Sequence, residues 1–85
     1  RPAVRTEDLD VRGMRAEEAV RELERHLDEC FRHGPSTIRV VHGHGSGALK
    51  HAVRQALEQF PYVAYHRPGG KHEGGDGVTI IELKE

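Results

Sequence analysis

Apolar residues recur along this chain with two different periods, and each period predicts one kind of secondary structure. Where they recur every three or four positions, the opposite face carries mostly charged residues, which is typical of a helix packed on a core. Where apolar and polar residues alternate, or β-branched residues cluster, a strand is favoured. The predicted helices cover residues 16–31 and 48–60. The predicted strands cover residues 7–11, 37–41, 63–66 and 78–83.

The order of these segments, β-α-β-α-β-β, predicts an α/β fold. Alternating strands and helices imply a parallel pair in the sheet, and the last two strands are expected to form an antiparallel hairpin across the glycine-rich loop at 68–77. We expect a two-layer sandwich with two helices on a mixed four-stranded sheet. The segment 37–41 has so little polarity that both of its faces are expected to be buried. Residues 1–6 are interpreted as a linker end and residues 7–85 as a single domain.

Charge and composition limit which partners and which cellular compartment fit this chain. The 13 Lys and Arg against 14 Asp and Glu leave the 85-residue chain almost neutral, so a nucleic-acid surface has to be a local patch. The one cysteine, Cys30, cannot form an internal disulfide and fits a reducing compartment. No apolar run is long enough for a membrane span or a signal peptide, so we expect a cytoplasmic protein without a membrane partner. The start at Arg1 and Pro2 reads as a piece of a longer protein.

The most informative local feature is the segment HGHGSG at 42–47, which lies between a predicted strand and a predicted helix. In such a unit the loop amides and the free N–H groups of the first helical turn point at one place, and the helix dipole favours an anion there. This predicts a phosphate site, although many such loops only permit a tight turn. His42 adds a titratable group at the entrance. The candidate phosphate ligands are Gly43, His44, Gly45, Ser46, Gly47 and Lys50.

Asp10 and Arg12 stand two residues apart at the end of the first predicted strand, so their side chains point the same way. Ligands of open sheets bind beyond the carboxyl ends of parallel strands. If the first two strands are neighbours, Asp10, Arg12 and His42 converge, and this set suits phosphodiester cleavage. His42 would move a proton, Arg12 would neutralise phosphoryl charge, and Asp10 would orient the histidine, activate a nucleophile or hold a divalent ion. In the structural alternative Asp10 only caps a turn or pairs with an arginine, and Arg12 is a surface charge.

Two familiar nucleotide motifs do not fit the glycine loop. A Walker A loop needs a glycine before its lysine, and Ala48 stands there instead. A dinucleotide loop needs an acidic residue at the end of the next strand, which this chain lacks. Asp10, His42 and His44 also offer ligands for a zinc ion, or more loosely for Mg²⁺ or Mn²⁺, so a metal stays an open alternative.

The second glycine-rich loop, at 68–77, is a further candidate contact with nucleic acid. Arg67 and Lys71 are expected to grip a phosphate backbone, and the positive residues at the start of the second helix would extend this patch. The alternative for this loop is a solvated hairpin tip.

The chain has four aromatic residues, which limits how many bases it can stack. Tyr62 and Tyr65 are the candidates for stacking on bases. Core packing is the better interpretation for Tyr65, as it is for Phe31 and Phe60.

Three segments resemble the signature blocks of the small MutS-related (Smr) domain family. They are LDVRG at 9–13, HGHGSGAL at 42–49 and GGDGVTIIEL at 74–83, in the family's order and spacing. The resemblance implies a β-α-β-α-β-β sandwich similar to the C-terminal domain of a bacterial translation initiation factor and to a DNase I-like core. It also implies nicking of DNA and, in several relatives, cleavage of RNA on stalled ribosomes. Such domains often close the C-terminus of the second bacterial MutS family, which acts in recombination control or on ribosomes.

The family's functional positions that match here are Asp10, Arg12 and His42, followed by the glycine loop. Two positions depart from the pattern. His44 stands where many relatives carry a basic residue, which would weaken phosphate binding at neutral pH. Arg12 stands where other members carry histidine. We interpret Arg12 as a phosphate clamp, because a guanidinium stays charged and cannot exchange protons at working pH.

These observations predict a structure-selective endonuclease domain that acts on DNA, RNA or both, since a phosphate is held in the same way in either. One alternative is a module that binds nucleic acid or the ribosome without cutting. A second is a protein-interaction tail that uses the acidic face of the first helix.

Overall fold

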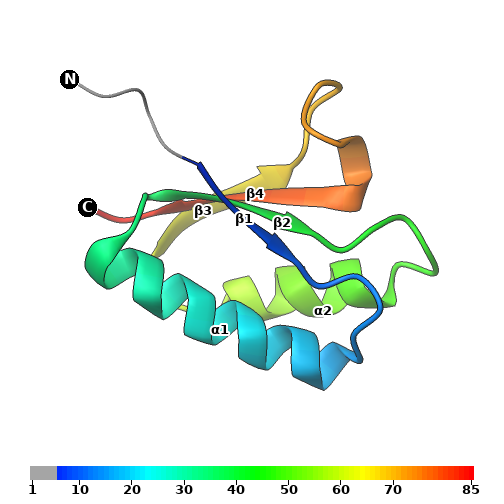
Figure 1. Ribbon diagram of the computed structural model, residues 1–85, viewed down its shortest axis with the longest axis horizontal. Coiled ribbons are helices and arrows are strands. Elements are labelled where there is room, and N and C mark those ends of the chain that lie inside the picture. Colours follow the sequence, from blue (N-terminus) through cyan, green and yellow to red (C-terminus); the bar gives the residue numbers. More distant parts are fainter. Residues whose placement is uncertain (1–5) are drawn as a thin grey trace.

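One four-stranded sheet with two helices on one of its faces makes up the fold (Figure 1). The computed structural model describes residues 6–85, with the strands in the spatial order β1-β2-β4-β3. The helices are α1 (Ala16–His33) and α2 (Ala48–Leu57), and a short 3-10 turn, η1 (Gly75–Gly77), precedes the last strand. The strands are β1 (Thr6–Asp10), β2 (Thr37–Val41), β3 (Val63–Pro68) and β4 (Val78–Leu83). The predicted two-layer α/β sandwich is confirmed.

The pairing of the strands brings three loops to one end of the sheet. β1 and β2 are parallel, whereas β4 lies between β2 and β3 and is antiparallel to both. Asp10, Val41 and Val78 stand side by side in one row. The connections that leave this row, β1 to α1, β2 to α2 and β3 to β4, therefore meet there, and Figure 1 shows them at the same end of the molecule.

The hydrophobic core lies between the sheet and the two helices. Leu23 and Leu27 of α1 and Val53 of α2 are fully buried against Ile38 of β2 and Ile81 of β4. The helices supply this core with apolar residues spaced three or four apart. The strands supply every second residue, because alternate side chains point to the same face of the sheet.

The prediction that β2 is buried on both faces is wrong. Ile38 and Val40 are buried, but the residues between and beside them are only half-buried. No helix of the described chain covers that other face, so it needs no continuous apolar run (Figure 1). Of the two inner strands, β4 is the one buried on both faces, with residues 78–81 all buried.

The ends of some elements differ from the predicted ones. α1 is two residues longer than expected, and α2 ends at Leu57 instead of residue 60. Of the predicted linker at 1–6, residues 1–5 lie outside the described residues, and Thr6 already belongs to β1. Among residues 6–85, no helix is both long enough and apolar enough to cross a membrane.

Three of the four aromatic residues, Phe31, Tyr62 and Phe60, stack on one another at the margin of the core. Phe31 and Tyr65 are 47% and 56% exposed, so their predicted burial is wrong. Phe60 does pack partly on the core. Tyr62 stacks on Phe31 on one side, with ring centroids 5.3 Å apart, and on Phe60 at 5.7 Å. Mutual stacking thus covers Phe31 and Tyr62, which the helical stripe alone does not bury.

Candidate functional site

The glycine loop at 42–47 keeps its shape through a contact with η1. Gly43 and Gly47 have positive φ angles of 82° and 90°, which favour glycine. The backbone N–H groups of His42 and Gly43 both donate to the carbonyl oxygen of Gly77, at 3.1 and 2.9 Å. The ring of His44 lies against the same residue, because a Cβ at position 77 would stand 2.7 Å from its Nε2. The loop between β3 and β4 therefore anchors the glycine loop.

A cavity of about 240 Å³ lies between the glycine loop and the first turn of α2. Met14 and Lys50 are among the residues that line it. The first N–H groups of α2 have no acceptor within the helix, and Oγ of Ser46 accepts from only one of them, that of Ala48, at 3.3 Å. This arrangement suits an anion, as the sequence predicts, but the N–H of Gly43 is already used by the carbonyl of Gly77.

His42 lines this cavity but is only 5% exposed, and both of its ring nitrogens have partners in the protein. Nδ1 lies 3.1 Å from the carbonyl oxygen of Gly43, and Nε2 lies 2.9 Å from Oγ1 of Thr79. Burial lowers the pKa of His42, and the charges of Arg54 and Lys50 act in the same direction. The neutral imidazole is therefore the favoured form in the free protein.

Asp10 contacts Arg12 and not His42. The carboxylate of Asp10 accepts hydrogen bonds from Nε and Nη2 of Arg12, at 3.0 and 2.7 Å, and from the backbone N–H of Arg12, at 3.0 Å. The hydrogen bond from the Arg12 side chain holds the pKa of Asp10 at about 2. The stem of Arg12 lies close to Gly43, whose missing Cβ would stand 3.4 Å from Cγ of the arginine. The prediction that the first two strands are neighbours is confirmed, since β1 pairs with β2. This pairing brings Arg12 next to the glycine loop.

Three charged groups connect α2 to η1: Lys50 in the first turn of the helix, Arg54 in its last turn and Asp76 of η1. Asp76 accepts a hydrogen bond from Nζ of Lys50 at 2.6 Å and a longer one from Nη2 of Arg54 at 3.3 Å. The hydrogen bond from Lys50 is the main reason why the pKa of Asp76 is lowered. Nε of Arg54 also donates to Oγ1 of Thr79 at 2.9 Å. Lys50 therefore stands at the predicted phosphate site, but with an acidic partner.

Sequence reasoning gave no role to Asp76 or Thr79, although both lie in the third signature block. One signal was available for Thr79. It is a polar residue at a position of β4 that faces the helices, between apolar neighbours, and it is fully buried. A buried hydroxyl in such a place needs partners, which points to a polar network.

The structure does not bring Arg67 to the cavity beside His42. Its guanidinium pairs with Glu73 at 2.8 Å, on the sheet face that lacks helices. There it lines a separate groove of about 360 Å³, together with Arg39 of β2. Lys71 is exposed in the β3–β4 loop. The predicted grip by Arg67 and Lys71 would therefore act on a different part of a nucleic acid than the glycine loop does.

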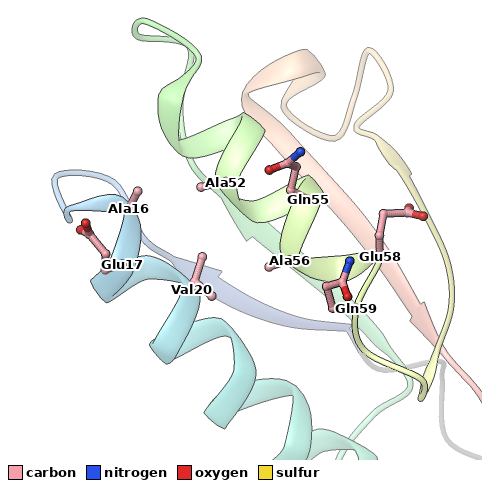
Figure 2. Close-up of a pocket in the computed structure, with 8 residues that line it drawn as sticks. All are labelled: Ala16, Glu17, Val20, Ala52, Gln55, Ala56, Glu58 and Gln59. Atoms are coloured by element: carbon pink, nitrogen blue, oxygen red, sulfur yellow. The ribbon is translucent and has the colours of Figure 1, made fainter.

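A larger groove, of about 670 Å³, separates α1 from α2 (Figure 2). Ala16 and Val20 of α1 face Ala52 and Ala56 of α2 across it, and glutamate and glutamine side chains form its rim. It holds no cationic side chain, histidine or cysteine, so it offers no phosphate chemistry. Within residues 6–85, no three side chains of His, Cys, Asp or Glu lie close enough to share a metal ion, so the zinc set of Asp10, His42 and His44 is not assembled.

Comparison with known proteins gives a consistent match over the chain. A family model described as the Smr domain matches residues 9–84. Endonuclease MutS2 of Anaeromyxobacter sp. (strain Fw109-5) is 51% identical over 76 residues, which cover 89% of this chain and 9% of that protein. Endonuclease MutS2 of Exiguobacterium sibiricum is 47% identical over 77 residues, or 91% of this chain and 10% of that protein. The chain thus spans about a tenth of the length of these curated relatives.

Two solved structures share the fold. The crystal structure of the Smr domain of Thermus thermophilus MutS2 superposes with a TM-score of 0.89 at 38% identity, covering 93% of this chain and 99% of that one. YdaL, a stand-alone small MutS-related protein from Escherichia coli, gives a TM-score of 0.85 at 19% identity, covering 92% of this chain and 64% of that one. The second likeness concerns the fold alone.

Proposed function

Because this chain belongs to the Smr domain family, we propose that it is a nucleic-acid endonuclease domain that nicks DNA, cleaves RNA or both. The relatives named endonuclease MutS2 support this class of reaction. One observation carries the proposal for this chain. A single end of the sheet holds the glycine loop, the start of α2 with Lys50, and Arg12 lying along Gly43.

Phosphate binding is the first part of the proposed function. A phosphodiester in the cavity would accept hydrogen bonds from the free amides at the start of α2, where the helix dipole is positive. Lys50 would exchange its contact with Asp76 for the phosphate. Arg12 would turn part of its guanidinium from Asp10 to the phosphoryl oxygens, where a planar fork fits two oxygens at once.

Cleavage is the second part. Water attacks phosphorus, the bond to the leaving oxygen breaks, and that oxygen takes up a proton while the water loses one. His42 is the titratable ring beside the cavity, and we assign it the transfer of a proton to the leaving oxygen, for which Nδ1 has to exchange the carbonyl of Gly43 for the substrate. The proton of the attacking water passes to the solvent. Asp10 keeps Arg12 in place and is the carboxylate available to a loosely held Mg²⁺ or Mn²⁺.

A binding module without nuclease activity is the second candidate. Its support is that His42 already uses both ring nitrogens and that Asp10 already has a bidentate partner. In that case the same loop holds phosphate and the ring only shapes the loop. Either candidate fits a part of a larger MutS-like cytoplasmic protein that acts in recombination control or on ribosomes.

A cleavage assay tests the two candidates against each other. Supercoiled plasmid and structured RNA are incubated with the wild type, His42→Asn and Asp10→Asn, with His33→Asn at the exposed end of α1 as the matched control. We expect both site variants to lose most cleavage while His33→Asn keeps it. Variants that lose cleavage but still bind labelled nucleic acid speak against the binding module. Equal cleavage by all four proteins overturns the catalytic assignment, and EDTA added to the wild type shows whether a metal is needed.

A further inference from the structure

Three polar side chains, those of Arg54, Thr79 and His42, form a hydrogen-bonded network between α2 and the glycine loop. Nε of Arg54 donates to Oγ1 of Thr79 at 2.9 Å, and this oxygen lies 2.9 Å from Nε2 of His42. Thr79 is fully buried and His42 nearly so. At the far end, Nδ1 of His42 reaches the carbonyl oxygen of Gly43 in the glycine loop. This network of side chains therefore connects α2 to the glycine loop, which lines the cavity.

The positions of the protons follow from what each group can do. The carbonyl of Gly43 only accepts, so Nδ1 of His42 is its donor. Nε of Arg54 only donates, so the oxygen of Thr79 accepts from it and keeps its own proton to give. Nε2 of the neutral ring then has only a lone pair, which accepts that proton. The opposite tautomer would direct the lone pair of Nδ1 at the carbonyl oxygen of Gly43, which has no proton to donate.

We propose that Thr79 is a positioning residue of this site: its hydroxyl, held by Arg54, fixes His42 as the Nδ1–H tautomer with Nδ1 toward the glycine loop. The tautomer stands on the geometry alone, whereas its importance for cleavage rests on the proposed endonuclease function. The hydroxyl is suited to both protonation states, because it can rotate and accept from Nε2 when the ring becomes charged. Valine, which has the same shape, can do neither.

Burial is the main cause of the lowered pKa of His42, and the charges around the ring modify it. Arg54 and Lys50 of α2 oppose its protonation, and Asp76 of η1 favours it. Asp76 is paired with both cations, so their effects partly cancel. A phosphodiester in the cavity would add a negative charge next to the ring and favour uptake of a solvent proton at Nε2. The imidazolium can then give its Nδ1 proton to a leaving oxygen, which leaves a neutral ring whose Nε2–H donates to the oxygen of Thr79. Thr79 would keep Nδ1 aimed at that oxygen during the change.

Nitrogen-15 NMR of the imidazole of His42 tests the tautomer in the 85-residue chain without any substrate. In the wild type at alkaline pH we expect the shift of a protonated Nδ1 and an unprotonated Nε2. Thr79→Val should move both shifts toward a mixture of tautomers, and Thr79→Ser should keep the wild-type pattern. Thr37→Val is the matched control, since Thr37 of β2 pairs with Glu82 and does not contact His42. A protonated Nε2 in the wild type overturns the proposal, and this result needs no variant to fold.

Cleavage kinetics test what the tautomer does. If the domain is an endonuclease, Thr79→Val should lower the single-turnover cleavage rate by roughly tenfold or more and shift its pH profile, while Thr79→Ser restores most of the rate. If the NMR shifts show the expected tautomer but the wild type cleaves nothing, the proposed function is overturned while the positioning of His42 by Thr79 stands. Full cleavage and an unchanged pH profile in a folded Thr79→Val protein would remove the role of Thr79.

Discussion

The ring of His44 lies so close to Gly77 that a Cβ at position 77 would stand 2.7 Å from Nε2 of the imidazole. This contact gives His44 a place in the glycine loop that the sequence does not reveal. A side chain at position 77 would therefore meet this ring unless the ring moved aside. The carbonyl of the same glycine holds the N–H groups of His42 and Gly43, so the fit concerns the whole loop.

Substituting Gly77→Ala should therefore displace the ring of His44 and lower the free energy of unfolding by up to about 1 kcal/mol. The exposed ring can move aside, which keeps the cost modest. In a double-mutant cycle, His44→Ala should remove part of this cost, with a coupling of about 0.5 kcal/mol or more. Urea unfolding of the four proteins measures it. Strictly additive effects would show that the ring does not press on position 77.

Removing the charge of Asp76 should strengthen binding of nucleic acid. Asp76→Asn leaves Lys50 and Arg54 without their anionic partner, so both become available to a phosphate. We expect roughly two- to fivefold tighter binding of a labelled oligonucleotide at low salt, fading as salt is added. Fluorescence anisotropy measures the affinity. Asp28→Asn on α1 changes the net charge equally and pairs with Arg32 instead, so it is the control. Equal gains in both variants would mean that only the overall charge matters.

Protonation of His42 should make the stability of the protein fall at mildly acidic pH. The pKa of His42 is lowered in the folded state because the ring is buried. The unfolded chain therefore binds this proton first, near its ordinary pKa of about 6.5. The free energy of unfolding should decline as the pH falls below about 6.5 and level off below the folded pKa, by at most about 1.4 kcal/mol per pH unit.

Urea unfolding of the wild type and His42→Asn across this range checks the assignment. The variant should lose this part of the pH dependence, and His33→Asn, at the exposed end of α1, should keep it. If the two variants behave alike, other groups cause the decline.

Arg12 should set the acidity of Asp10. The hydrogen bond from the Arg12 side chain holds the pKa of Asp10 at about 2. Arg12→Ala should raise this pKa toward the usual value of aspartate, near 3.9, while the backbone N–H of residue 12, which still donates to Asp10, keeps it below that value. Because the folded pKa is the lower one, the pair stabilises the protein above about pH 4, and this contribution is lost as the pH falls toward 2. Carbon-13 NMR titration of the Asp10 carboxyl measures both values. An unchanged pKa in Arg12→Ala would mean that the pair does not persist in solution.

Much of the fold follows from local patterns in the sequence. The period of α1 and the β-branched run of β4 depend on neighbouring residues alone, so their positions are predictable within a few residues. The same patterns place Asp10 and Arg12 at a strand end and His42 before a helix. The glycine content of the loop, with positive φ angles at Gly43 and Gly47, is also local.

The rest depends on which strands become neighbours. Because β4 lies between β2 and β3, Thr79 stands opposite Val40 and within hydrogen-bond distance of His42. No local pattern in the sequence predicts the pairing of β2 with β4. For the same reason the enclosed strand is β4 and not β2. Phe31 illustrates a different limit. Its position next to the buried Cys30 resembles a core site, but stacking on Tyr62 leaves it at the surface.

The carbonyl of Gly77 has a consequence for how a nucleic acid would engage this domain. It holds the glycine loop, and it also ends the exposed β3–β4 loop that carries Lys71. A nucleic-acid strand that pulled on the tip of that loop would therefore also pull on the cavity beside His42. We therefore expect the two loops to move together, so that a contact made at Lys71 also affects the cavity beside His42.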